Sequence, residues 1–165
     1  MRYWFDTEFM EDGEHVRMLS IGIVCEDGRE MYVCRSDADH RLANEWVTAN
    51  VLPHLDPAED AIWTDRKALA SRLRMWVGQG NGKPEFWAYY GDYDWVIFCQ
   101  LFGRMIDLPK HFPRFCLDIK QRCTDLGNPK LPKQTEGAHN ALADARHNKV
   151  MLEFLDKLAM SRAEK

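Results

Sequence analysis

Residues 2–9 read Arg-Tyr-Trp-Phe-Asp-Thr-Glu-Phe, an aromatic run followed by two acids. The aromatic run at residues 3–5 favours a β-strand, and its apolar character predicts a buried central strand over residues 2–6. Asp6 and Glu8 follow where that strand should end, which is the usual ligand position in an α/β sheet. Because alternate residues of a strand share a face, the two acids would point the same way if the strand continues.

Two later clusters offer related chemistry. Asp94 lies in mid-chain, and His139 precedes Asp144 by five residues. Gathering these acids with Asp6 and Glu8 in one site is costly unless a cation holds them together, and oxygen ligands suit Mg²⁺ or Mn²⁺. Two such ions about 3.5–4 Å apart are a device for hydrolysing phosphodiesters. His139 would then be the general base that deprotonates the attacking water.

The order of the clusters resembles the DEDDh 3′→5′ exonucleases: Asp-x-Glu at 6–8, an aromatic residue and Asp at 93–94, and a late His and Asp at 139 and 144. A closer resemblance, over roughly residues 1–155, is to the polyadenylate-specific 3′-exoribonucleases called RNase AS. Its matches are Met1-Arg2-Tyr3, Asp6-Thr7-Glu8-Phe9, Ser20-Ile21-Gly22, Val51-Leu52-Pro53, Cys99-Gln100-Leu101, Pro113-Arg114-Phe115, Ala141-Leu142 and Asp144-Ala145-Arg146.

This resemblance implies a ribonuclease-H-like fold and a metal-dependent 3′→5′ exoribonuclease. Its substrate would be single-stranded RNA with a free 3′-OH, adenylate-rich as in poly(A) tails, and its products nucleoside 5′-monophosphates such as AMP. It also implies a homodimer. Two Mg²⁺ ions, or Mn²⁺, would be held by four acids, namely Asp6, Glu8, Asp94 and Asp144, with His139 as the base.

Substrate contacts are also implied. Glu8 and the backbone around Thr7 would meet the hydroxyls of the terminal ribose, as the resemblance implies. Phe9 is the best candidate to stack on a base, with Tyr93 beside it, although single aromatic residues in a small α/β domain more often belong to the core. Many DEDDh enzymes have Asn-Ala ahead of the mid-chain acid, where this chain has Tyr90-Gly91.

The residues leave alternatives open for the mid-chain acid and for the function. Asp92 competes with Asp94, and we expect Asp92 to cap a helix because the family's acid directly follows an aromatic residue. The other five histidines are interpreted as structural or solvated. The rival functions are a general DEDDh exonuclease acting on single-stranded DNA or short oligonucleotides, and a catalytically idle nucleic-acid-binding module.

Composition fits one globular domain over residues 1–165, with 161–165 a frayed tail; the resemblance implies that it is a DEDDh exonuclease domain. Apolar residues make up 45% of the 165 residues, no apolar run reaches membrane-spanning length, and the N-terminus is not a signal peptide. Five cysteines without a Cys-x-x-Cys pair predict reduced thiols in a cytoplasmic protein and argue against zinc. The net charge is −4, but residues 103–133 hold seven basic and three acidic residues. That segment either follows a phosphate backbone or carries scattered solvated charges.

The remaining pattern predicts an α/β fold with a mixed sheet flanked by helices, its first three strands antiparallel. The expected strands are 2–6, 17–25, 29–34 and 85–89, with a hairpin turn at 26–28. One expected helix includes Leu42, Trp46 and Val47, and a second spans 69–77 with a cap at Thr64 or Asp65. Two more are expected at 92–101 and 117–126. The last helix is expected to begin near Asn140, after a loop at 128–137. Leu142, Ala145, Leu152, Leu155 and Ala159 should form the buried side of the last helix.

Overall fold

The computed structural model describes residues 1–55, 61–135 and 137–163, and in this part of the chain six strands form one mixed sheet. The strand order is β4-β3-β2-β1-β5-β6. β1–β2 and β2–β3 are antiparallel, whereas β3–β4, β1–β5 and β5–β6 are parallel. The strands are β1 (Arg2–Glu11), β2 (Val16–Cys25), β3 (Glu30–Arg35), β4 (Ile62–Thr64), β5 (Glu85–Ala88) and β6 (Leu117–Asp118). The predicted mixed sheet with three antiparallel leading strands is confirmed.

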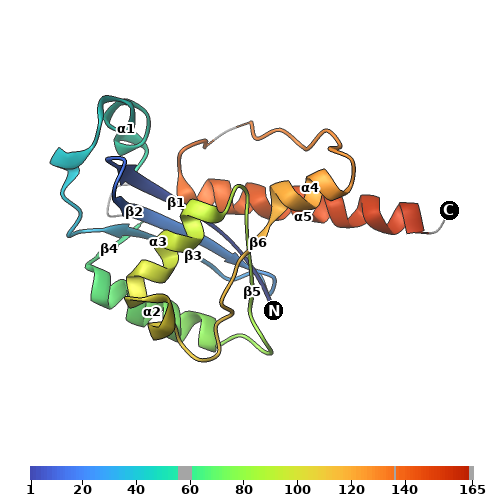
Figure 1. Ribbon diagram of the computed structural model, residues 1–165, viewed down its shortest axis with the longest axis horizontal. Helices are drawn as coiled ribbons and strands as arrows, with labels where there is room; N and C mark the ends of the chain where they lie inside the picture. Colours follow the sequence, from blue (N-terminus) through green and yellow to red (C-terminus); the bar gives the residue numbers. More distant parts are fainter. Residues whose placement is uncertain (56–60, 136, 164–165) are drawn as a thin grey trace.

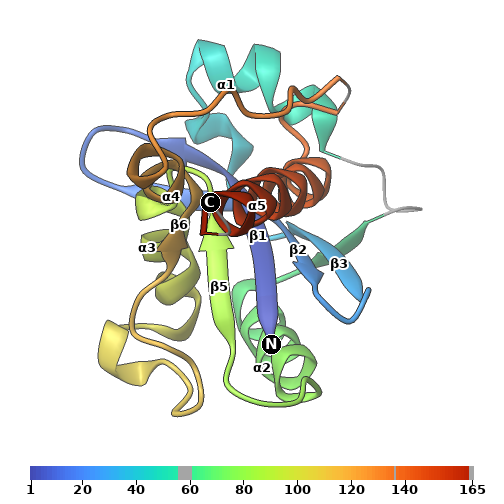
Figure 2. The ribbon, with the colours of Figure 1, turned by 90° about the vertical axis from the view of Figure 1, so that its right-hand side faces the viewer.

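Helices cover both faces of this sheet. They are α1 (Glu45–Asn50), α2 (Arg66–Gly78), α3 (Asp92–Phe102), α4 (Ile119–Asp125) and α5 (Ala141–Ala163). The long α5 lies on one side of the sheet, and α2 and α3 lie on the other (Figures 1 and 2). α1 packs at the far end of β1, where Val47 and Val51 contact Met10 and Leu19. None of the described helices is long and apolar enough to cross a membrane.

The alternation along β1 sets the direction of the acids. Tyr3 and Phe5 pack into the core cluster that includes residues of α2 and α3, whereas Trp4 packs with residues of α4 and α5. Successive side chains of a strand point to opposite faces. Asp6 and Glu8 therefore continue the Trp4 face toward α5.

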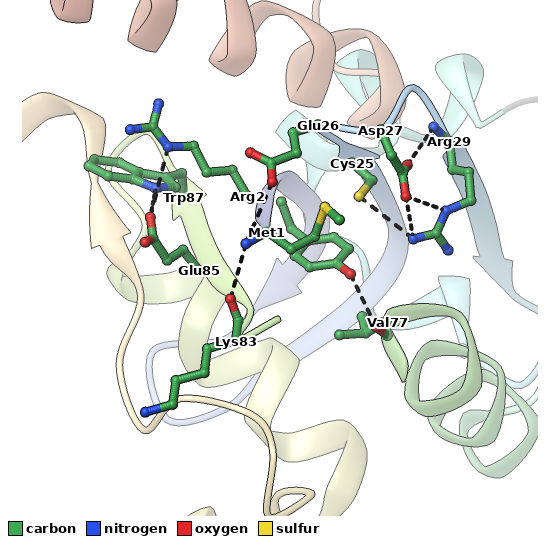
Figure 3. Close-up of polar contacts among 11 residues, drawn as sticks. Met1, Arg2, Cys25, Glu26, Asp27, Arg29, Val77, Lys83, Glu85 and Trp87 are labelled. Carbon is green, nitrogen blue, oxygen red and sulfur yellow. Dashed lines mark hydrogen bonds and ion pairs between the residues drawn. The ribbon is translucent and has the colours of Figure 1, made fainter. Parts of the chain in front are cut away.

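The N-terminal end of β1 is tied to its surroundings, as Figure 3 shows. The Met1 amine donates a hydrogen bond to the Lys83 carbonyl at 3.1 Å and pairs with Glu26 at 3.5 Å. The buried Tyr3 hydroxyl donates to the Val77 carbonyl at 3.1 Å. These contacts fix the N-terminal end of the strand that carries Asp6 and Glu8.

One glycine lets α5 reach the sheet. Gly22 on β2 is the register partner of Asp6. A Cβ atom at Gly22 would lie 2.2 Å from the Ala141 carbonyl oxygen and 2.3 Å from the Leu142 Cα atom. The first turn of α5 therefore lies directly on the backbone of β2, next to Asp6.

The strands differ from expectation in two respects. β1 does not end at residue 6 but runs to Glu11, because it stays paired with β2 through an irregularity between Glu8 and Phe9. The acids thus lie within the strand and not at its end. The short edge strands β4 and β6 were not predicted, since three and two residues carry too little periodicity to recognise.

Helix ends also needed correction. The residue that caps α3 is Gly91, so the prediction that Asp92 is the cap was wrong, and Asp92 is the first helical residue. Residues 117–118 are strand and not helix; α4 begins after Asp118, whose side chain accepts from the Gln121 N–H. Leu42 lies outside α1, in the 3-10 turn His40–Leu42.

The last helix, α5, is longer than predicted, and its buried side agrees with the prediction in part. α5 continues through residues 161–163, which were expected to fray, and residues 164–165 lie outside the described residues. Ala145, Leu152 and Leu155 are buried as predicted, whereas Leu142 and Ala159 are only half-buried.

Candidate active site

Three carboxylates meet between β1 and α5. One oxygen of each of Asp6, Glu8 and Asp144 lies within 4.8 Å of the others. Asp6 and Glu8 come from the same face of β1, and Asp144 comes from the first turn of α5 that Gly22 admits. The structure thus brings together two of the three sequence clusters at one point.

Asp94 reaches the same region from the opposite face of β1. The Thr7 backbone N–H and the Thr7 hydroxyl both donate to Asp94 Oδ1, at 2.8 and 2.6 Å. Asp94 is only 6% exposed, whereas Asp92 faces solvent. The buried contact with the Asp-x-Glu strand brings Asp94, and not Asp92, to this region as its fourth acid, and Asp94 Oδ2 carries no bond to Thr7.

The carboxylates strain one another electrostatically. Burial, together with the charges of Asp94, Asp144 and Glu8, raises the pKa of Asp6 well above its usual range. Burial and the charges of Asp144 and Asp94 raise the pKa of Glu8 to about 8. Burial raises the pKa of Asp94 to about 6 against the lowering effect of its Thr7 bonds. The group stays fully ionised near neutrality only if positive charge joins it.

The loop before α5 arranges Asp144 and His139. The Asp144 carboxylate accepts from the Gln134 amide at 2.6 Å and from the His139 backbone N–H at 3.1 Å. Burial raises the pKa of Asp144, and these two bonds oppose the shift. Asn140 caps α5 by accepting from the Ala143 N–H at 3.1 Å. His139 therefore lies just outside the helix, which begins beside Asn140 as predicted.

The two aromatic substrate candidates form a pair. Phe9 and Tyr93 stack with ring centroids 5.7 Å apart and planes at 8°, and Tyr93 is 57% exposed. Thr7 is buried with both its donors on Asp94, so the structure gives it a role in holding that acid. A substrate contact by Thr7 stays a prediction.

Four residues of the region were not singled out from the sequence. Gln134 holds Asp144, and Asp118 accepts from the Gly91 N–H at 2.7 Å, which attaches the start of α3 to β6. His147, interpreted as structural or solvated, lines a pocket of about 340 Å³ together with Asp6 and Asp144. Trp46 contacts the His139 ring. Only Asp118 had a local signal, as an acid just before a helix.

The residues fit a hard divalent cation. The three converging groups all offer carboxylate oxygens, and among the described residues no thiol or imidazole joins them. Oxygen-only sites suit Mg²⁺ or Mn²⁺. The raised pKa values of Asp6 and Glu8 describe a group that is unfavourable without a cation.

The basic segment 103–133 does not form one track. Arg104 pairs with Asp107, and Arg122 with Asp156. The turn that contains Arg104 lies far from α4 (Figure 2). Lys133 is exposed and is adjacent in sequence to Gln134, which bonds Asp144.

Comparison with known proteins decides the family. Residues 1–155 match the family described as 3′-5′ exoribonuclease Rv2179c-like domain. The chain belongs to this exoribonuclease family. It is 42% identical over 147 residues to the 3′-5′ exoribonuclease Rv2179c of Mycobacterium tuberculosis strain H37Rv, with 88% of each chain covered. The 3′-5′ exoribonuclease MT2234.1 of strain CDC 1551 gives the same figures.

Solved structures share the fold at low identity. E. coli exonuclease I, in complex with a dT13 oligonucleotide, is 15% identical with a TM-score of 0.68 over 99% of this chain. This chain spans 42% of that protein. S. pombe Pop2p is 13% identical with a TM-score of 0.52, over 94% of this chain and 81% of that one. The fold is therefore ribonuclease-H-like, as predicted.

Proposed function

We propose that residues 1–165 form a single two-metal 3′→5′ exoribonuclease domain that releases nucleoside 5′-monophosphates from single-stranded RNA. The observation that carries this proposal is the convergence of Asp6, Glu8 and Asp144 within 4.8 Å, in a chain of an exoribonuclease family. Asp94, buried against Thr7, completes the set of acids. Pop2p, which has the same fold, was solved in an Mg²⁺- and Mn²⁺-bound form.

The acids have separate roles in this proposal. Asp6, Glu8, Asp94 and Asp144 hold two Mg²⁺ ions, with Mn²⁺ as the substitute. When bound, the ions supply activation of the attacking water and neutralisation of the charge that develops on the leaving 3′-oxygen. Thr7 and Gln134 hold one oxygen each of Asp94 and Asp144, which fixes the direction of the other oxygens.

His139 takes the proton of the attacking water. The backbone N–H of His139 donates a hydrogen bond to Asp144, one of the proposed metal ligands, and this bond keeps the His139 backbone beside the metal site. A general base must come within hydrogen-bond reach of the proton that it removes. The first turn of α5 and the loop that carries His139 therefore place the metal ligand Asp144 and the base next to each other.

The substrate end is proposed from the arrangement of Glu8, Phe9 and Tyr93. Glu8 and Phe9 line a pocket of about 420 Å³ that also includes residues of α1. The terminal ribose would meet Glu8, and a base would stack on the Phe9–Tyr93 pair. Adenylate preference, homodimerisation and a cytoplasmic location are proposed on the sequence resemblance and composition.

Substrate comparison tests the activity. Purified protein should shorten 5′-labelled oligo(A) one nucleotide at a time from a free 3′-OH, yield AMP and stop with EDTA. Oligo(A) should be degraded faster than oligo(U), oligo(C) or single-stranded DNA of equal length. Equal rates on the RNAs would remove the adenylate preference, faster cleavage of DNA would favour the general exonuclease, and binding without cleavage would favour an idle module.

A histidine pair tests the base. His139→Ala should lower kcat by about 10²–10⁴-fold with little change in KM, because the base acts in the transition state. His147→Ala is the comparison, because His147 lines the neighbouring pocket with Asp6 and Asp144. A full kcat in His139→Ala with a large loss in His147→Ala would transfer the role to His147.

A further inference from the structure

The ring of Trp46 contacts the ring of His139. Trp46, on α1, lies edge to face with the imidazole, with ring centroids 5.3 Å apart and planes at 89°. Edge-to-face contact is a favoured geometry for aromatic pairs. Trp46 is 56% exposed, so burial in a core does not explain its position.

α1 provides a firm support for this indole. Val47 and, one turn later, Val51 are buried against residues of β1 and β2. The Asn44 side chain caps the helix by accepting from the Val47 N–H at 2.9 Å. The side chain of Trp46 leaves the helix about 100° round from that of Val47, so it projects from a helix attached to the strand that carries the acids.

His139 has a fixed backbone, whereas its ring has no hydrogen bond to any residue that the structure describes. Its φ of 67° lies in the left-handed region, and its N–H is held by Asp144. The Asn140 side chain donates to the His54 carbonyl at 3.4 Å, which joins the same loop to the turn after α1. Across the described residues no hydrogen bond orients the imidazole, and Trp46 is the ring packed against it.

We propose that Trp46 is a positioning residue that holds the His139 imidazole in the orientation needed to accept the proton of the attacking water. This inference rests on the proposed role of His139. Without the indole, the imidazole samples other rotamers, so a smaller fraction of enzyme–substrate complexes has the base aligned. α1 would then serve catalysis although it carries none of the acids.

A second role for Trp46 makes a different prediction. Trp46 lines the same pocket as Glu8 and Phe9, so it could instead stack on the terminal base. Loss of a stacking partner weakens substrate binding and raises KM. Loss of a positioning contact lowers kcat and leaves KM nearly constant.

A double-mutant cycle separates these roles. Trp46→Ala and Trp46→Phe are measured on 5′-labelled oligo(A) at saturating Mg²⁺, each alone and combined with His139→Ala. Leu42→Ala is the matched control, because Leu42 is 53% exposed in the turn before α1. The Tm of each variant confirms folding.

The expected result is a kcat lowered roughly three- to tenfold in Trp46→Ala, the size typical of one aromatic pair, with KM changed less than about twofold. Trp46→Phe should recover most of the loss, and Leu42→Ala should match wild type. In the His139→Ala background, Trp46→Ala should cause no further loss, because the group that it positions is gone.

Four outcomes would overturn the inference. Additive losses in the two backgrounds would show that Trp46 acts independently of His139. A raised KM with an unchanged kcat would make Trp46 a base-stacking residue. A His139→Ala variant with full kcat would remove the proposed base and this role together, whereas a slow His139→Ala beside an unaffected Trp46→Ala would remove only the role of Trp46.

Discussion

Gly22→Ala should damage both folding and catalysis. The added methyl would lie 2.2 Å from the Ala141 carbonyl oxygen and 2.3 Å from the Leu142 Cα atom. Both are backbone atoms of the first turn of α5, so no flexible side chain can turn aside to make room.

The geometry gives the size of the effect. Ordinary van der Waals contact begins at 3.4 Å, so the start of α5 must retreat by about 1.2 Å. Asp144 moves with that turn, away from Asp6 and Glu8. Displacing a reacting group by about 1 Å can cost on the order of 10²-fold in rate. Overpacking typically costs about 1–3 kcal/mol in the free energy of unfolding, or roughly 2–12 °C in Tm for a domain of this length.

The assay pairs kcat/KM on labelled oligo(A), measured well below the Tm of the variant, with thermal unfolding. Gly78→Ala is the matched control, since a Cβ atom there meets nothing within 4 Å and Gly78 lies in α2. It should be neutral or stabilising by about 0.5–1 kcal/mol. Wild-type activity and Tm in Gly22→Ala would refute the close approach of α5 to β2 and the placement of Asp144 that depends on it.

Three further results are expected. Asp6→Asn and Asp144→Asn should each reduce turnover to background, while the Tm in EDTA stays constant or rises because repulsion among buried carboxylates falls; a large drop in that Tm would contradict the electrostatic account. The folded-state pKa of Glu8, about 8, is raised above its unfolded value, so its contribution to stability is present at low pH and is lost as pH rises toward 8. The metal-free protein should therefore lose stability, on the order of 3 kcal/mol, between pH 5 and pH 8, and Glu8→Gln should flatten that slope in urea unfolding. Saturating Mg²⁺ should stabilise the wild type against unfolding by about 2.7 kcal/mol at 100 times Kd, which raises its Tm. In differential scanning calorimetry the Tm of Asp6→Asn should not change when Mg²⁺ is added.

The sequence predicted those elements of the fold for which one local residue pattern favours one structure. The aromatic run of β1 predicted a buried strand, and the hairpin at 26–28 predicted the antiparallel start of the sheet. Asn140 predicted the start of α5 through its cap. These are local signals, because the responsible groups are neighbours along the chain.

What the sequence could not predict depends on pairing between distant residues. β1 runs past Asp6 because β2 continues to pair with it, and nothing local to residues 6–11 records that. Asp94 is buried in contact with Thr7, which is far away in sequence, whereas Asp92 is exposed. Trp46 and Gln134 also lie at the site because of tertiary packing, that of α1 and that of the loop before α5.

The order in which the chain delivers its acids has a consequence for synthesis. Asp6 and Glu8 leave the ribosome first, Asp94 follows, and His139 and Asp144 arrive last, on an α5 that packs against β1 and β2. Domains form from the N-terminal side while translation proceeds at about 5–20 residues per second. Until α5 has emerged and docked, the proposed nuclease lacks its base and one of its acids. We therefore expect a nascent chain to be unable to hydrolyse the message from which it is being translated.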